Sequence, residues 1–540
     1  MSNNRQCGTG AGCSGHLPNF LVFCVDQMQS YCLGCNGHPV VKTPNIDALA
    51  ARGVNFRRGY CNNPVCMPSR ATMITGKTPR QHGLLTNGNS LSRDVPTVTQ
   101  ALADAGYRTH SAGKLHLQPS GGFFGDHLAS AEWNKAWWRG ERHRLPSPYY
   151  GYQTTDFVGG HVTYSFGEYR SWLLAHHPES SRRLAKDQAY HSCGEGFRID
   201  LPEEHHYNHW IADRSIAFLE KVPGVRCHVS GNRESRAASR TQGVSPETRN
   251  PTPETSPTPF FLFCSFPDPH FPFAACRPYS EMYDPQALPL PSTLAARVDV
   301  CSYLARTSGG RGSASPEEMR EILAQTYGMI SHVDANVGRV MAALEASGQA
   351  DSTIILFVAD HGEYLGSHGL LYKGAWPYEE LWRIPFIAAG PGVQPGVCEV
   401  PVSLLDLTPT FLDYAGLDPL ALDTRGPGPM NRLPPAGQSL RPFLEGHLAA
   451  PHQSLVMEYD EDLGDAPVCR LRGLIDGDWK IVLYGGFDDG VLLNLADDPR
   501  ELHNLWNEPS VQGRKTELLA RLVQRLAQTD RFDAARPCGA

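Results

Sequence analysis

The sequence lacks any long hydrophobic run. Its strongest apolar segments are residues 19–25, 260–266 and 353–358, which are strand-sized. They fall well short of the ~18–20 residues that a membrane-spanning helix needs. The sequence also has no excess of positive charge, because it contains 48 Lys and Arg residues and 56 Asp and Glu residues, which give a formal net charge of −8. We therefore predict neither a membrane protein nor a protein that binds nucleic acid through a basic surface.

We also predict neither a secretory leader nor a metal-binding cysteine framework. The first residues, MSNNRQCGTGAGCSGHLPN, contain one Arg and no apolar core, unlike a secretory signal. We expect a cytoplasmic protein with a flexible N-terminus over residues 1–17. The 15 cysteines are scattered, and many, such as Cys24 and Cys264, fall in apolar runs typical of buried reduced thiols. Cys32 and Cys35 form one CxxC, but no second pair follows, so we predict no zinc site.

Strand-like runs alternate with helical patterns through most of the chain. This alternation predicts an α/β fold, a large and mostly parallel sheet with helices on both faces. The predicted strands are residues 19–25, 107–111, 260–266 and 353–358, and the predicted helices are residues 43–53, 98–105, 210–222 and 316–348. Residues 230–259 are rich in Ser, Thr, Pro, Arg and Glu, and they predict a disordered insertion.

The pattern changes after Gly416. Pro- and Gly-rich loops precede four short strand-like runs, residues 454–459, 470–475, 479–484 and 491–495, and an amphipathic helix over residues 512–528. We therefore expect a catalytic domain over residues 18–416 and a small C-terminal α+β subdomain with an antiparallel sheet over residues 417–540.

The segment NPVCMPSRATMITG, residues 63–76, holds the most informative pattern. Cys66 stands two residues before Pro68, which suits the first turn of a helix, and four residues before Arg70. Such a helix would direct free backbone N–H groups toward an anion, and Arg70 would add a cation near Cys66.

This segment resembles the signature of the sulfatase family in the alkaline phosphatase superfamily, C-x-P-S-R followed by T-G. The matching residues are Cys66, Pro68, Ser69, Arg70, Thr75 and Gly76. The resemblance implies an alkaline-phosphatase-like fold. It also implies that Cys66 is oxidised to formylglycine by a formylglycine-generating enzyme, that the aldehyde hydrate is the nucleophile, and that Arg70 holds this hydrate.

Two carboxylates follow strong predicted strands. Asp26 follows residues 19–25 and Asp360 follows residues 353–358, so a parallel sheet would bring both to one edge. Two such carboxylates need a cation, and His361 adds a nitrogen donor. The resemblance implies that Asp26, Cys66, Asp360 and His361 bind one divalent ion. Calcium is the favoured ion and manganese the alternative.

Gln27 and His361 stand where many sulfatases have Asp and Asn. This departure resembles the branch that contains choline sulfatases and phosphonate monoester hydrolases. In phosphonate monoester hydrolases a phenol and a hydroxyl are typical at the positions of Lys114 and His116, whereas this chain has the Lys and His of sulfatases.

Further polar groups resemble elements of the family. Lys114 and His116 lie in AGKLHL, His270 in FPDPHFPF, and Lys373 in LYKGAWPYEE. We expect Lys114, Lys373 and His270 to surround the substrate anion, with His270 or Lys373 protonating the leaving alcohol. His116 would assist release of the hydrate, and Asn87 is a candidate neutral donor to the substrate.

Together these patterns predict a hydrolase that cleaves a small-molecule sulfate monoester to an alcohol and sulfate. The alternative on the same fold is a phosphonate or phosphate monoester hydrolase. A non-catalytic, anion-binding relative is a third hypothesis. The sequence argues against it, because every catalytic position that the resemblance implies is filled. A homo-oligomer is possible.

Overall fold

The computed structural model describes residues 17–121, 129–190, 196–222, 258–296, 300–307, 314–419, 422, 435–448, 454–462 and 467–529. The expected flexible N-terminus lies outside the described residues except for Leu17, and so does the expected insertion except for residues 258 and 259. No helix in the described part of the chain is long and apolar enough to cross a membrane.

A nine-stranded sheet forms the centre of the molecule, in the order β11-β2-β10-β8-β1-β7-β4-β5-β6. Strands β8, β1, β7, β4 and β5 are mutually parallel, whereas β10 and β6 are antiparallel to their inner neighbours. The mostly parallel sheet is therefore confirmed. The bounds are β1 Asn19–Val25, β2 Val54–Phe56, β4 Arg108–Gly113, β5 Thr154–Gly159, β6 Phe166–Gly167, β7 Phe260–Phe266, β8 Thr353–Ala359, β10 Phe386–Ala389 and β11 Gly396–Cys398.

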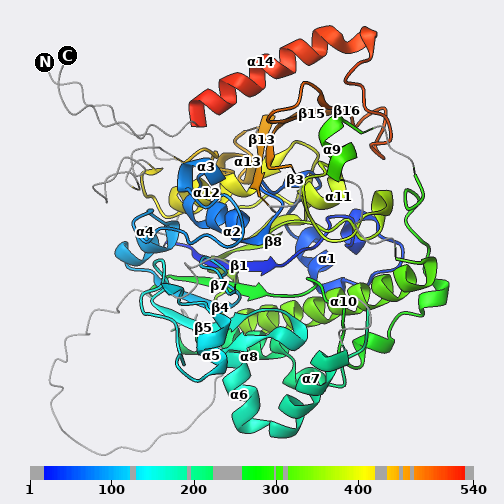
Figure 1. The fold of residues 1–540 in the computed structure, drawn as a ribbon. Coiled ribbons are helices and arrows are strands. Elements are labelled where there is room, and N and C mark those ends of the chain that lie inside the picture. Colours follow the sequence, from blue (N-terminus) through cyan, green and yellow to red (C-terminus); the bar gives the residue numbers. More distant parts are fainter. Residues whose placement is uncertain are drawn as a thin grey trace, which may run out of the picture.

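Helices cover both faces of this sheet (Figure 1). One face carries α1 (Pro44–Ala51), α8 (Tyr207–Lys221) and α10 (Pro316–Ala346), which contact one another or the central strands. The other carries α2 (Cys66–Thr75), α4 (Val98–Asp104) and α12 (Leu407–Tyr414). The remaining longer helices are α6 Glu168–His176, α7 Pro178–Tyr190 and α14 Gln512–Thr529, and the shorter ones are α3 Pro79–His82, α5 Asn134–Trp138, α9 Ser302–Thr307, α11 Glu379–Trp382 and α13 Arg441–Leu444.

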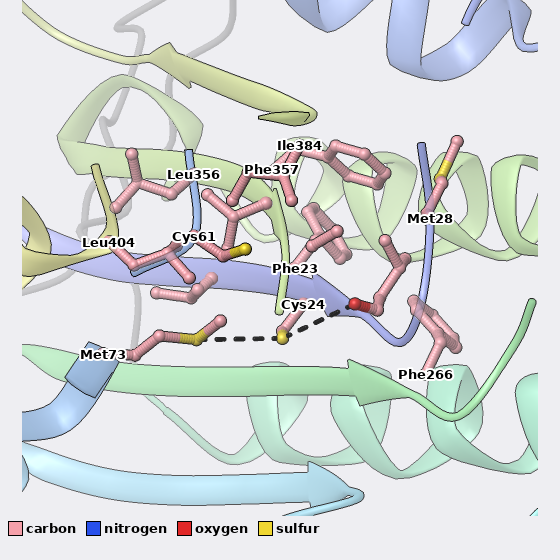
Figure 2. Close-up of a cluster of buried hydrophobic side chains, with 14 of the residues drawn as sticks. Phe23, Cys24, Met28, Cys61, Met73, Phe266, Leu356, Phe357, Ile384 and Leu404 are labelled. Atoms are coloured by element: carbon pink, nitrogen blue, oxygen red, sulfur yellow. Dashed lines mark hydrogen bonds between the residues drawn. The ribbon is translucent and has the colours of Figure 1, made fainter. Parts of the chain in front are cut away.

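The core around β1 explains why its cysteine is inert. Figure 2 shows Cys24 among apolar side chains, with its Sγ atom 4.0 Å from the sulfur of Met73 on α2. Burial raises the pKa of the Cys24 thiol to about 12, and it does the same for Cys264 on β7. Both thiols are buried and free, as the sequence predicted.

Two smaller sheets complete the fold. One contains β12 (Val402–Ser403), β3 (Gly59–Tyr60) and β9 (Arg383–Ile384). The other is antiparallel and contains the four predicted C-terminal strands, β13 Ser454–Glu461, β14 Cys469–Asp476, β15 Trp479–Tyr484 and β16 Gly490–Asn494. Some of its apolar residues, such as Tyr459 and Leu471, join the main core, while others, such as Leu474 and Leu492, pack with α14 in a separate cluster.

Strand β15 holds the loop that carries Lys373. The Tyr484 hydroxyl donates to the carbonyl of Ala375 at 2.8 Å, and Lys480 Nζ donates to the carbonyl of Pro377 at 2.8 Å. Lys480 is fully buried and also pairs with Glu379 at 2.6 Å and with Glu501 at 2.7 Å. Burial opposes ionisation of Glu379, but Lys480 holds the pKa of this carboxyl below its ordinary value.

Replacing Lys480 by Met should strongly destabilise the protein, because the buried Glu379 carboxylate would lose its nearest cation and keep only Arg383, at 3.8 Å. We expect a loss of about 3 kcal/mol or more in the free energy of unfolding, measured by urea denaturation. The control is Arg52→Met, which removes an exposed ion pair with Glu345 and should cost under about 1 kcal/mol. Equal small losses in both variants would show that Lys480 does not anchor this region.

Candidate active site

Two buried carboxylates lie side by side at the carboxyl edge of the sheet. Strands β1 and β8 pair in parallel with Val25 opposite Ala359, so Asp26 and Asp360 emerge at the same level. Both side chains have 0% exposure. This placement confirms that the strand order brings the two predicted carboxylates together.

Arg70 binds both carboxylates from α2. Its Nε atom donates to Asp360 at 2.7 Å and its Nη2 atom donates to Asp26 at 3.2 Å. Its Nη1 atom donates to the carbonyl of Lys114 at 2.9 Å and to the hydroxyl of Ser265 at 3.0 Å. These contacts make Arg70 a cation shared by the two carboxylates, and its predicted contact with a hydrate on residue 66 stays a prediction.

Cys66 begins α2, as the Pro68 spacing predicted. Its buried Sγ atom lies 3.0 Å from Lys373 Nζ, 3.1 Å from His361 Nε2 and 3.5 Å from an oxygen of Asp26. Burial and Asp26 oppose ionisation of the thiol, but Lys114, Lys373 and His361 outweigh them, and the pKa of Cys66 is lowered. Residue 66 therefore occupies a pocket of positive potential suited to an anionic substrate.

Asn87 supplies the cap that α2 lacks locally. Val65 at the N-cap has no side-chain oxygen, and the amide oxygen of Asn87 accepts the N–H of Met67 at 3.0 Å. Asn87 therefore lies next to Cys66, but its side-chain oxygen is used to accept a backbone N–H at the start of α2. Its predicted role as a donor to the substrate rests on its NH₂ group alone.

The orientation of His361 directs its Nε2 atom toward the other predicted ligands, where Lys373 Nζ also lies 3.3 Å from it. Its Nδ1 atom lies 2.8 Å from the carbonyl of Gly362, which assigns the Nδ1 proton to that contact. The Nε2 lone pair then faces Cys66 and the carboxylates. Ligand atoms of Asp26, Cys66, Asp360 and His361 all lie within 4.8 Å of one another, so the four predicted ligands could share one ion.

Two lysines enter the site from different elements. Lys114 follows β4, and its ammonium group forms a short contact with Asp26 and lies 3.0 Å from His161 Nε2. Gly113 permits this geometry, because its φ is +110° and a Cβ atom would lie 1.9 Å from the carbonyl oxygen of Ser265. Lys373 lies 3.0 Å from the Gln27 amide oxygen and 2.9 Å from His270 Nε2.

His270 is neutral in this arrangement. Its Nδ1 atom contacts the carbonyl of Phe271, so Nε2 is the acceptor for the Lys373 ammonium. Burial and the nearby His161 and Lys373 hold the pKa of His270 well below its ordinary value. Of the two predicted proton donors, Lys373 is therefore the one with a proton at the reacting centre, because the ring proton of His270 is on Nδ1.

His116 is also neutral and is affected by the same charges. Burial, Lys114 and Arg70 hold its pKa well below the ordinary value. Its backbone has a positive φ of 56°, and its N–H donates to Glu132 at 2.8 Å. Glu132 also accepts the N–H of Leu117 at 2.9 Å and the hydroxyl of Tyr149 at 2.7 Å, and it thereby fixes this turn.

Two residues at the site escaped the sequence analysis. His161 stacks on His270 with ring centroids 3.5 Å apart and contacts Lys114. Glu363 binds the Gln27 side chain, and burial raises its pKa to about 7. Glu363 could have been suspected from its place directly after the Asp360–Gly362 segment, but nothing in the local sequence around His161 distinguishes it.

A second buried group of potential ligands, His206, Cys276 and His332, lies between α8 and α10. His206 precedes α8, and its Nδ1 atom accepts the N–H of Asn208 at 3.2 Å. This contact leaves the proton of the neutral ring on Nε2, which opposes metal binding there. We interpret the group as packing around the start of α8.

The sheet, the buried carboxylates at its edge and the cysteine at a helix N-terminus define an alkaline-phosphatase-like enzyme. The chain matches the sulfatase family over residues 18–157 and 246–417, and it matches the C-terminal region of N-sulphoglucosamine sulphohydrolase over residues 366–529. The chain belongs to the sulfatase family.

Known relatives cover nearly the whole chain. The choline-sulfatase of Rhizobium meliloti (strain 1021) is 28% identical over 534 residues, which cover 96% of this chain and 88% of that protein. The arylsulfatase of Clostridium perfringens (strain 13 / Type A) is 26% identical, with 94% of each chain covered. The crystal structure of the phosphonate monoester hydrolase of Agrobacterium radiobacter superposes with a TM-score of 0.71 at 24% identity, covering 95% of this chain and 96% of that one.

Helix α2 is supported by a buried histidine whose titration can be measured. The His82 Nδ1 atom accepts the N–H of Leu84 at 3.2 Å, and its Nε2 atom lies 3.2 Å from the Thr72 hydroxyl on α2. Burial lowers the pKa of His82 from 6.5 to about 3. Below pH 6.5 the unfolded chain binds a proton at this residue and the folded protein does not, so stability falls as the pH drops toward 3.

The His82→Gln variant should therefore lose less stability on acidification. Between pH 7.5 and pH 5 we expect the wild-type protein to lose about 2 kcal/mol more than the variant, measured by urea denaturation at both pH values. His503→Gln, at an exposed site, is the control and should behave as wild type. Identical pH dependence in wild type and His82→Gln would contradict the assignment.

Proposed function

We propose that this protein hydrolyses a sulfate monoester to an alcohol and sulfate, with residue 66 as the nucleophile. The observation that carries the proposal is the position of Cys66. It starts a helix, lies beside two buried carboxylates, and is contacted by Lys373 and His361. Membership of the sulfatase family supports oxidation of Cys66 to formylglycine, whose hydrated aldehyde would supply the attacking hydroxyl.

The residues present fit one divalent ion. Asp26, Asp360, His361 and residue 66 converge, and the His361 Nε2 lone pair faces the group. When bound, such an ion would polarise the sulfate oxygens and lower the pKa of a hydroxyl on residue 66. Carboxylate oxygens favour calcium, and the nitrogen donor of His361 is compatible with manganese.

The surrounding side chains would stabilise the charge that develops during sulfuryl transfer. The Lys114 ammonium group contacts Asp26 and the Lys373 ammonium group contacts Cys66, so both would lie close to the non-bridging oxygens of a sulfate held at residue 66. Lys373 is placed to donate a proton to the leaving alcohol, with the neutral His270 holding its ammonium group. The neutral His116 would accept a proton as sulfate is released.

Replacing Cys66 by Ala should remove essentially all turnover and leave the fold intact. Loss of a nucleophile usually costs several orders of magnitude in rate, so we expect under about 1% of wild-type activity toward 4-nitrophenyl sulfate. The control is Cys398→Ala, another buried cysteine, which should keep its activity. Peptide mass spectrometry of the wild type should show residue 66 as formylglycine, and substantial activity in Cys66→Ala would exclude it as the nucleophile.

Replacing Asp360 by Asn should weaken metal binding and activity together, because it removes one of two carboxylates at the proposed metal site. Elemental analysis after dialysis should give one divalent ion per wild-type chain and clearly less in the variant. Asp351→Asn, at an exposed position before β8, should retain both ion and activity. Full metal content and activity in Asp360→Asn would show that the ligand set is wrong.

The main alternative is a phosphonate or phosphate monoester hydrolase, and Lys114 with His116 distinguishes the two. The matured enzyme should have a higher kcat/KM for 4-nitrophenyl sulfate than for the matching phenyl phosphonate, because close cations assist departure of the leaving oxygen. Replacing the pair, Lys114→Tyr with His116→Thr, should narrow or invert this preference. Faster hydrolysis of the phosphonate by wild type would favour the alternative.

A further inference from the structure

A cavity of about 460 Å³ opens beside the two stacked histidines of the site. Aromatic side chains from three segments form most of its wall, together with these histidines: Trp138, Tyr164, Phe166, Phe271, His161 and His270. Its size is within the range of pockets that bind drug-sized molecules. The proposed chemistry uses the far side of the histidines and leaves the role of this cavity open.

The cavity lies next to the reacting centre, because the two histidines belong to both. His161 and His270 line the cavity, and their Nε2 atoms lie 3.0 Å from Lys114 Nζ and 2.9 Å from Lys373 Nζ, respectively. Lys373 is in turn 3.0 Å from Cys66 Sγ. A sulfate group held at residue 66 would therefore direct its ester substituent past the histidines into this cavity.

The aromatic wall is open to solvent. Trp138 is 49% exposed and Tyr164 is 43% exposed, although both are large apolar side chains. The Trp138 ring packs against Phe166 at a centroid distance of 6.2 Å and an angle of 78°, so it is held in place at the rim. Exposed aromatic rings around a cavity at an active site are typical of a ligand-binding surface.

The polarity of the cavity wall indicates which ester substituents the cavity can bind. No Asp, Glu, Lys or Arg lines it among the described residues. Aromatic rings can hold a quaternary ammonium, but a cation here would lie near the Lys373 ammonium group, and no carboxylate of the described wall would attract it. A sugar needs several hydrogen-bond partners, and apart from the two histidines the wall offers only the side chains of Ser120 and Asn134, with the Tyr164 hydroxyl.

We propose that this cavity binds the leaving group and selects a neutral aromatic alcohol, a phenol with room for more than one ring. This inference rests on the proposed sulfatase function and adds the class of substrate. Stacking and edge contacts with Trp138, Phe166 and Phe271 would hold the rings, while the sulfate lies at residue 66. The preference for an aromatic alcohol follows from the aromatic side chains of the cavity wall, and it does not depend on how the ester bond is broken.

Binding can be measured without chemistry in the Cys66→Ala protein. Calorimetric titrations with 2-naphthyl sulfate, choline sulfate and glucosamine 6-sulfate compare a ring, a cation and a sugar that carry the same anion. We expect 2-naphthyl sulfate to bind at least about tenfold more tightly than either of the others. Tighter binding of choline sulfate or of the sugar sulfate would overturn the proposal.

Trp138→Ala, made in the same background, tests the wall itself. It should weaken binding of 2-naphthyl sulfate about tenfold and change binding of choline sulfate little. Leu174→Ala removes an exposed apolar side chain on α6, outside the cavity wall, and should have no effect. Unchanged naphthyl binding in Trp138→Ala would overturn the proposed role of the cavity.

The two proposals fail in different ways. If the wild-type enzyme with confirmed formylglycine hydrolyses none of the three sulfates while 2-naphthyl sulfate still binds, the sulfatase function is wrong and the aromatic site stands. If choline sulfate or glucosamine 6-sulfate is hydrolysed with the highest kcat/KM and also binds most tightly, the function stands and the aromatic preference is wrong.

Discussion

Two fully buried carboxylates, each directly after one of two neighbouring parallel strands, place a strong electrostatic constraint on this molecule. Asp26 and Asp360 cannot both remain ionised at the edge of the sheet without positive charge close by. Arg70 meets this need from α2 and Lys114 meets it from the end of β4. The helix that brings Arg70 to the carboxylates also brings Cys66 beside them, with the Cys66 Sγ atom 3.5 Å from an Asp26 oxygen.

The C-terminal sheet has a part in the site although it contributes no side chain to the reacting centre. The loop between Asp360 and α11 carries Lys373, and strand β15 holds this loop through Tyr484 and Lys480. Because Lys480 pairs with Glu379 at the start of α11, the C-terminal sheet and the segment that ends the Lys373 loop stabilise each other. The match to the C-terminal family region begins at residue 366, before Lys373, which agrees with this physical connection.

Continuous apolar runs made the central strands predictable. Residues 19–25 and 260–266 form β1 and β7 with the predicted bounds, because strands buried on both faces need no polar alternation. The positions of Asp26 and Asp360 were predictable as well, because each residue directly follows a strand and the carboxyl ends of parallel strands lie at one edge of the sheet. His161 could not be predicted in this way, since it reaches the site through an irregular turn in which Val162 has a φ of +41°. The contact of Asn87 with α2 likewise depends on a loop that local sequence patterns do not determine.

The central claim is that residue 66 attacks sulfur, and a Cys66→Ser variant tests it most directly. Serine offers one hydroxyl in place of the two on an aldehyde hydrate, so attack would form a sulfate ester that cannot be released by elimination. After incubation of this variant with 4-nitrophenyl sulfate, peptide mass spectrometry should find one sulfate group on residue 66 and none elsewhere. Absence of this adduct, together with turnover of the same ester by the wild-type enzyme, would contradict the account.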